Sequence, residues 1–254
     1  RTVPFVSKAT GVQMAKAAAL IGTGVTIHQL RTAYKVLPET GDGSTLPLDA
    51  PVAVKEAVLP FNRFRTPEGT VVDSLLGPEM RSTGEVMGID KYFDTAFAKS
   101  QAAANSALPT SGKVFVSVAN RDKRSIIMPV KLLVDLGFEI LSTGGTAEVL
   151  RRNGIQSTTV RKVAEGRGPD GEGTIVDLIT EGAIGLILNT PSGGQARGDG
   201  YEIRAAATSV GTPVITTVSE FGAAIQAIEA MRQYEWDVTS LQEHALKLKA
   251  AVDA

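Results

Sequence analysis

The strongest constraint on the fold is a regular alternation of short β-branched runs and helical patterns that begins at Lys113. Strand-like runs occupy residues 114–118, 138–141, 157–160, 185–188 and 213–217. Helical patterns lie near residues 123–136, 146–153, 174–181, 200–210 and 219–232, and a capping box, Ser240-Leu-Gln-Glu243, opens a last helix. Strands that alternate with helices indicate βαβ units and a parallel sheet covered on both faces. We therefore predict that residues 111–254 form one α/β domain, with a five-stranded parallel sheet flanked by helices.

Residues 1–110 follow a less regular pattern. A helical run at 14–21 ends at two glycines, residues 52–58 are strand-like, and a turn and short strand within 75–87 precede a helix at 91–104. The first eight residues contain no initiator methionine and are typical of a strand-and-loop segment. This amount of loop is unusual for a self-sufficient domain. We expect residues 1–110 to be the tail of a larger domain, and the chain to be a fragment of a longer polypeptide.

Charge and composition exclude several classes of protein. The 26 Lys and Arg residues nearly balance 27 Asp and Glu residues, which predicts no nucleic-acid-binding or membrane-binding face. No apolar run approaches the roughly 20 residues that span a bilayer. The absence of cysteine rules out disulfides, thiolate metal sites and a cysteine nucleophile in this chain, and it fits a cytoplasmic location. The two histidines, His28 and His244, have no metal-ligand spacing around them.

Polar residues follow each predicted strand of the second part. In an open parallel sheet, ligands bind outside the carboxyl ends of the strands, beside helix N-termini. Hydroxyls of Thr143 and Thr146, backbone N–H groups at Gly144 and Gly145, and cationic side chains suit a phosphate. The further strand-end residues are Ser117, Lys123, Lys162, Asn189, Asp199 and Thr216. Together they predict a pocket for a phosphorylated small molecule.

Each of these signals has a plainer interpretation. Residues 142–146 are also typical of an N-capped strand-to-helix turn, residues 189–194 of a surface loop, and lone lysines of solvated charges. The agreement among five strand ends favours the pocket. Residues 166–171 match G-x-G-x-x-G, but Pro169 interrupts the pattern and no acidic residue follows about 20 positions later. We interpret this segment as a mobile loop.

Three segments of the chain resemble a known family. Residues 1–11, 54–62 and 76–88 are similar to the large chain of carbamoyl-phosphate synthases, and the resemblance covers nearly all 254 residues. It implies the C-terminal end of that chain, in which the tail of the second ATP-grasp unit, an α+β fold, precedes a methylglyoxal-synthase-like allosteric domain.

The resemblance also implies an activity. The family is an ATP-dependent ligase that makes carbamoyl phosphate from bicarbonate, glutamine-derived ammonia and two ATP, with Mg²⁺ or Mn²⁺, for pyrimidine and arginine synthesis. A glutaminase small subunit is the expected partner, and a homo-oligomer of that heterodimer is left open. Arg1 matches an arginine beside the phosphorylated carbamate and is the expected catalytic residue. The family's metal ligands precede Arg1, so we expect no metal site, no required cofactor and no turnover in the isolated chain.

The resemblance assigns two effector sites. UMP, the inhibitor, and IMP, the activator, are expected at Ser117, Lys123, Thr143, Thr146, Lys162, Asn189 and Asp199. Ornithine, another activator, is expected at Glu56, Leu59 and Thr216. The chain departs from the family pattern at Gly145, where the family has His, and at Pro191, where it has Thr. The loops at 166–173 and 40–48 are also longer.

Two other functions stay open at this point. A free-standing methylglyoxal synthase, a phospho-sugar lyase, needs a carboxylate base, and Glu172 stands near that position where the enzyme has Asp. An α/β binding module unrelated to carbamoyl phosphate is the other alternative.

Overall fold

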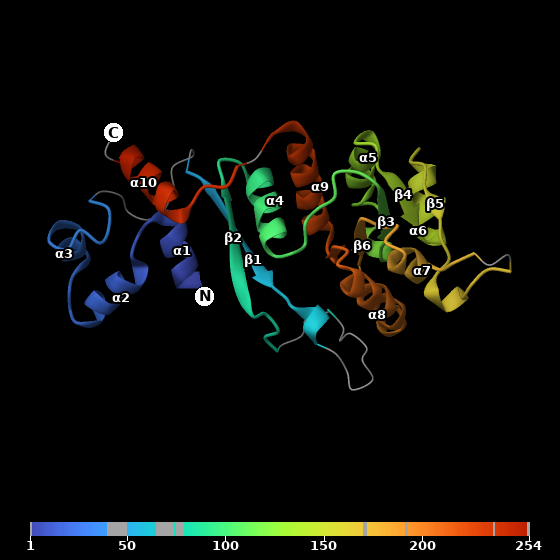
Figure 1. Cartoon of the computed structure of the whole chain (residues 1–254), viewed down its shortest axis with the longest axis horizontal. Helices are drawn as coiled ribbons and strands as arrows, with labels where there is room; N and C mark the ends of the chain where they lie inside the picture. The colour runs from blue at the N-terminus through green and yellow to red at the C-terminus, as the bar shows by residue number, and fades with distance from the viewer. Residues whose placement is uncertain are drawn as a thin grey trace.

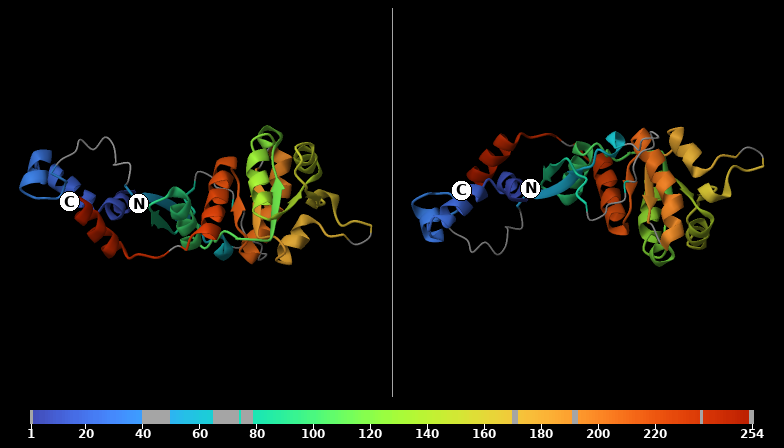
Figure 2. Two further views of the ribbon diagram at one scale, coloured as in Figure 1. Left: turned by 90° about the horizontal axis from the view of Figure 1, so that it is seen from above. Right: turned by 90° about the horizontal axis from the view of Figure 1, so that it is seen from below.

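The chain forms an elongated molecule with both termini near one end (Figures 1 and 2). The computed structural model describes residues 2–39, 50–64, 74, 79–169, 172–190, 193–235 and 237–252. Helices α1 (Thr2–Thr10), α2 (Met14–Gly22), α3 (Ile27–Thr32) and α10 (Leu241–Val252) lie at that end. A parallel sheet with its helices forms the other end, and a two-stranded sheet lies between them.

The parallel sheet has the predicted number and direction of strands. It contains β3 (Lys113–Ser117), β4 (Glu139–Ser142), β5 (Thr158–Thr159), β6 (Leu186–Asn189) and β7 (Val214–Ile215). All neighbours pair in parallel, in the order β5-β4-β3-β6-β7. The predicted α/β fold class, with a five-stranded parallel sheet flanked by helices, is therefore confirmed. The last predicted helix, α10, packs on α1 at the other end of the molecule.

Helices cover both faces of this sheet because alternate strand residues point to opposite sides. On β3, Val114 and Val116 belong to a core shared with α5 (Ile127–Asp135) and α9 (Val218–Gln233). Phe115, between them, packs in a second core with α7 (Ile175–Thr180) and α8 (Gly193–Val210). The remaining helix, α6 (Gly144–Arg152), follows β4 and contributes Leu150 to the first core. The two apolar cores hold the strands side by side, so the carboxyl ends of the strands lie along one edge of the sheet.

The two-stranded sheet is joined to the parallel sheet through one helix. Strands β1 (Val52–Val58) and β2 (Gly84–Asp90) pair antiparallel, and α4 (Phe93–Ala103) packs on both strands and on α9. Gly88 makes this approach possible, since a β-carbon there would lie 1.9 Å from the Ala96 carbonyl oxygen. The close contact packs the two-stranded sheet tightly on α4, and the packing of α4 on α9 then joins the first part of the chain to the second. The predicted division at residues 110 and 111 stays a prediction.

One sequence prediction is wrong, because residues 2–10 form helix α1 instead of a strand and loop. Thr and Val in this segment favour strands, and Pro4 opposes a helix interior. Pro4 lies in the first turn, however, where its missing N–H costs nothing. Helix α1 packs against α2 and α10, and the His244 ring Nε2 lies 3.2 Å from the Ala9 carbonyl oxygen. Tertiary contacts therefore override the local preference.

In the described part of the chain, no helix combines the length and apolar character that crossing a membrane requires.

Candidate functional site

The carboxyl edge of the parallel sheet encloses a small cavity, the strand-end pocket. Strand register aligns this edge, since Ser117 at the end of β3 pairs with Asn189 at the end of β6. The cavity has a volume of about 220 Å³. Six of the seven predicted effector residues line it, namely Ser117, Lys123, Thr143, Thr146, Lys162 and Asn189. The seventh, Asp199, belongs to α8, but its side chain lies outside the described residues.

Hydrogen bonds between neighbouring strand ends fix the floor of the strand-end pocket. The hydroxyls of Ser117 and Thr143 share a hydrogen bond of 3.2 Å, and the Ala119 N–H donates to Thr190 Oγ1 at 2.9 Å. The Val118 N–H lies 3.4 Å from Thr146 Oγ1, its acceptor. These bonds tie the loop after β3 to the loops after β4 and β6. The pocket is therefore preformed.

The strand-end pocket suits an anion. Thr143 is the N-cap of α6, so the positive end of this nine-residue helix faces the pocket. Lys123 is partly buried and Lys162 is exposed, and both line the cavity. No carboxylate lines it among the side chains that the structure describes. A phosphate would thus meet cations and N–H donors without a repelling charge.

The strand-end pocket also contains a buried acceptor. Asn189 is 7% exposed, and its Oδ1 has no hydrogen-bond partner among the described residues. A buried amide oxygen without a donor costs free energy, which a ligand hydroxyl or N–H would recover.

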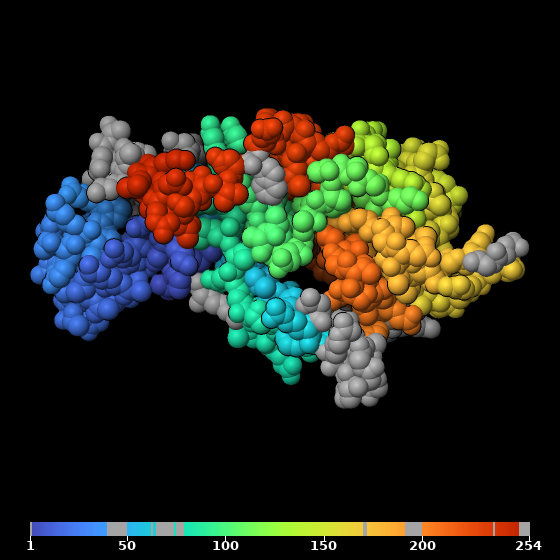
Figure 3. All heavy atoms as spheres, viewed as in Figure 1, coloured from blue at the N-terminus to red at the C-terminus, as the bar shows by residue number. Residues whose placement is uncertain are grey.

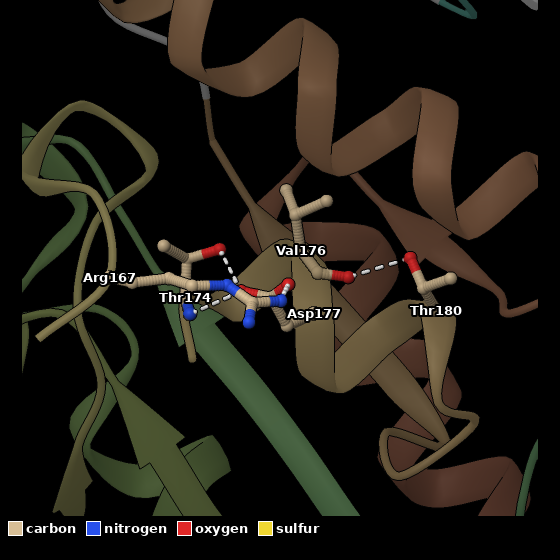
Figure 4. A network of polar contacts seen from close by, with 5 residues as sticks. All are labelled: Arg167, Thr174, Val176, Asp177 and Thr180. Atoms are coloured by element: carbon tan, nitrogen blue, oxygen red, sulfur yellow. Dashed lines mark hydrogen bonds and ion pairs between the residues drawn. The ribbon is translucent and has the colours of Figure 1, made fainter. Parts of the chain in front are cut away.

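A capping network holds the segment that carries Lys162 (Figure 4). The N–H and hydroxyl of Thr174 donate to Asp177 Oδ2 at 2.7 and 3.0 Å, and Arg167 reaches Asp177 Oδ1 at 2.6 Å. The bond from the Thr174 backbone, and next the Arg167 bond, hold the pKa of the Asp177 carboxyl below its usual value. Arg161, beside Lys162, forms a parallel bridge to Thr174. The loop between these residues is therefore anchored at its base.

The walls of the strand-end pocket include residues that sequence reasoning did not identify. Val163, Ile175 and Ile203 form an apolar wall, which no sequence signal separates from ordinary core. Arg204 is fully buried beside Gly200, which lines the pocket, since a β-carbon on Gly200 would lie 2.5 Å from Arg204 Nη1. Apolar surface beside an anion site fits a ligand that carries more than a phosphate.

A second and larger cavity lies between the two-stranded sheet and the parallel sheet. This junction cavity has a volume of about 850 Å³, and the predicted ornithine residues Glu56, Leu59 and Thr216 all line it. Its walls come from β1, the turn η1 (Phe61–Arg63), residues 104–106, the end of α8, β7 and the start of α9. Figure 3 shows the surface hollowed where α4, η1 and α8 meet.

Two glutamates face the junction cavity. Glu56 Oε2 accepts a hydrogen bond from Gln101 Nε2 at 2.9 Å, and its Oε1 accepts from the Ala57 N–H at 3.0 Å. Glu220, in the first turn of α9, was not identified from the sequence. Burial first, and the nearby Glu56 charge second, raise the pKa of Glu220 to about 7, against the effect of a hydrogen bond from the Thr216 backbone. The cavity is therefore acidic.

Other charged residues of the first part form ion pairs, with 3.8 Å between Lys55 and Glu85 and between Arg81 and Glu79. Arg1 and Pro191 lie outside the described residues. Gly145 lies under Lys123, since a β-carbon there would be 3.1 Å from Lys123 Nζ. Among the described residues no group of three His, Asp or Glu side chains is placed to hold a metal ion.

Comparisons with known proteins agree with this architecture. The family model described as "MGS-like domain" matches residues 125–216. The carbamoyl phosphate synthase large chain of Paenarthrobacter aurescens (strain TC1) is 82% identical over 100% of this chain and 23% of its own length. That of Pseudarthrobacter chlorophenolicus is 83% identical over 98% of this chain and 22% of its own length. The chain thus spans less than a quarter of the length of these relatives.

Solved structures resemble about half of the chain. Methylglyoxal synthase from Elizabethkingia anophelis NUHP1 is 15% identical, covers 54% of this chain and 91% of its own, and has a TM-score of 0.39. The high identity along the whole chain and the domain match lead to one conclusion. Residues 125–216 match the model of an MGS-like domain, and the sequence is similar, from end to end, to part of the carbamoyl phosphate synthase large chain.

Proposed function

We propose that this chain is the regulatory end of a carbamoyl phosphate synthase large chain. In this proposal the strand-end pocket binds UMP or IMP and the junction cavity binds ornithine. The observation that carries the proposal is the clustering of predicted residues. Six described effector residues line one pocket, and all three ornithine residues line the other.

The strand-end pocket would bind the nucleotide through its phosphate. Lys123, Lys162 and the N-terminus of α6 supply positive charge, and the hydroxyls of Thr143 and Thr146 supply short donors. Asn189 Oδ1 would accept from a ligand hydroxyl or N–H, and the apolar wall would contact the base or sugar. Asp199 stays a proposed member of this site.

The junction cavity would bind ornithine through its ammonium groups. The Glu56 carboxylate is held in place by Gln101, so it is oriented before the ligand arrives. Leu59 and Thr216 line the same cavity from opposite parts of the chain. A ligand here touches both parts, so its binding free energy depends on how they are arranged, and this dependence is what allosteric coupling requires.

The whole-protein activity is part of the proposal. The full ligase would use ATP with Mg²⁺ or Mn²⁺, a glutaminase small subunit and a cytoplasmic location, and would serve pyrimidine and arginine synthesis. Arg1 would stabilise charge beside the phosphorylated carbamate. No step of that reaction is assigned to the described residues, and we expect no turnover by the isolated chain.

The lyase alternative has less support. A proton abstraction beside a phosphate needs a carboxylate base within hydrogen-bond reach of the substrate. Glu172 is exposed and does not line the strand-end pocket, whose described lining side chains include no carboxylate. The pocket therefore fits binding better than catalysis.

Calorimetric titration of the chain with UMP, IMP and ornithine, in phosphate-free buffer, tests the proposal. We expect saturable binding of one or both nucleotides and of ornithine. An absence of heat with all three ligands would contradict both site assignments. Conversion of dihydroxyacetone phosphate to methylglyoxal would instead favour the lyase.

A further inference from the structure

The charged groups of the junction cavity point to a residue that the resemblance did not assign. Among the described residues that line it, the charged side chains are Glu56 from β1, Arg63 from η1 and Glu220 from α9. Two carboxylates from opposite parts of the molecule thus share one cavity. They are close enough that the Glu56 charge influences the titration of Glu220.

The two carboxylates differ in the hydrogen bonds that they accept from the protein. Glu56 accepts from Gln101 and from the Ala57 N–H, which fixes its position. Glu220 is partly buried and receives a backbone hydrogen bond from Thr216. No lysine or arginine forms a salt bridge with either carboxylate among the described residues within 4.0 Å. A cation in the cavity would relieve the repulsion between them and compensate for burial.

We propose that Glu220 is a specificity-determining residue of the junction cavity, where it pairs with an ammonium group of a bound basic amino acid. The inference rests on the proposed ornithine site and adds one ligand-binding side chain to it. One ammonium carries three N–H donors and can therefore serve both Glu56 and Glu220. A neutral or acidic amino acid would leave the second carboxylate uncompensated, so the pair selects a basic ligand.

The pairing predicts that a proton leaves when the ligand binds. Near neutral pH the empty cavity holds Glu220 partly protonated, because its pKa lies at about 7. A bound ammonium favours the charged carboxylate and lowers that pKa, so a fraction of a proton is released to the buffer. A purely structural role for Glu220 would not link a proton to the ligand.

Calorimetry with ornithine at pH 7, in two buffers of different ionisation enthalpy, tests the proposal with Glu220→Gln. We expect at least about tenfold weaker binding, as for a lost charge-assisted hydrogen bond, and loss of the proton release seen with the unmodified chain. Glu220→Asp keeps the charge and should bind more tightly than Glu220→Gln. Glu229→Gln is the matched control, since Glu229 is exposed on the same helix and accepts a hydrogen bond from Gln233 Nε2 away from the cavity.

The outcomes separate this inference from the proposed function. If the unmodified chain does not bind ornithine, the proposed function of the cavity fails. If it binds, and Glu220→Gln binds equally well with the same proton release, the assignment of Glu220 is wrong while the ornithine site stands. Thermal unfolding of each variant, with a single transition as in the unmodified chain, shows that the comparison is made on folded protein.

Discussion

The two cavities of this molecule are built in opposite ways. The strand-end pocket is small, cationic and made by neighbouring loops of one sheet. The junction cavity is almost four times larger, acidic and assembled from both parts of the chain. A ligand of the first pocket needs only the parallel sheet to be intact. A ligand of the second also requires the two-stranded sheet and α4 to stay packed against α9.

The two cavities share one structural element, helix α8. Helix α8 contributes Gly200 and Ile203 to the strand-end pocket, and Thr208 near its end to the junction cavity. One rigid element therefore borders both. Opposite charge would keep the two proposed ligands apart, because Glu56 would repel a phosphate, and Lys123 and Lys162 would repel an ammonium.

The largest expected effect comes from separating the two-stranded sheet from α4, the helix that joins it to α9. Gly88→Ala places a β-carbon against the Ala96 carbonyl and the Ser100 N–H, so α4 must move away from β2. We expect the free energy of unfolding, measured with urea, to fall by about 3 kcal/mol. Ornithine binding should weaken more than nucleotide binding.

Gly84→Ala on the same strand is the control, because no atom lies within 4 Å of its added β-carbon. Equal stability of Gly88→Ala and Gly84→Ala would show that the close contact between α4 and β2 does not stabilise the fold.

A smaller effect concerns the pH dependence of stability. The pKa of Glu220 is raised from 4.5 to about 7, so the folded protein binds more protons than the unfolded chain between these values. The contribution of Glu220 is most favourable below pH 4.5 and is lost as the pH rises through 7. The Glu220→Gln variant stays neutral at every pH. Its free energy of unfolding should therefore exceed that of the unmodified chain by about 1 kcal/mol at pH 5, rising to about 3 kcal/mol at pH 8.

Urea titrations at both pH values measure that gain, with Glu229→Gln as the control. A stability difference that stays constant with pH would mean that Glu220 titrates normally.

The smallest effect is expected inside the strand-end pocket. Gly145→Ala brings a β-carbon to 3.1 Å from Lys123 Nζ, which must shift by a few tenths of an ångström. Because the lysine is long and flexible, we expect only about a two- to fivefold loss of nucleotide affinity. Gly144→Ala, with no atom within 4 Å, is the control in the same helix turn. Equal affinities in calorimetry would show that Lys123 does not bind the phosphate from this position.

The contrast between the strand-end pocket and the junction cavity also explains which site residues the sequence could predict. The strand-end residues were found because each follows a strand, and parallel strands carry their carboxyl ends to one edge. Thr216 was also found as a strand-end residue, but it lines the junction cavity and not the strand-end pocket. The assignment of Glu56, Leu59 and Thr216 to one ornithine site came only from the resemblance, since no local pattern tells that β1 and β7 border one cavity. In the sequence, Glu220 looks like an ordinary acidic residue in the first turn of a helix. Its proposed pairing with an ammonium depends on Glu56, which Gln101 of α4 holds in the same cavity.

Long-range packing also explains the errors and omissions. The helix at Thr2–Thr10 depends on its contacts with α2 and α10, which local propensity cannot include. Arg167 and Asp177 are ten positions apart and still form an ion pair, and Arg204, a residue type usually exposed, is fully buried. Sequence periodicity therefore predicted the parallel sheet well and the junction poorly.

The central claim is that the chain carries two separate sites of opposite charge. Titration of UMP and ornithine into Lys162→Ala and Glu56→Ala tests it most directly. We expect Lys162→Ala to lose about 10- to 100-fold in UMP affinity while ornithine binding is unchanged, and Glu56→Ala to show the reverse. If either substitution weakened both ligands equally, or neither, the assignment of the two cavities would be wrong.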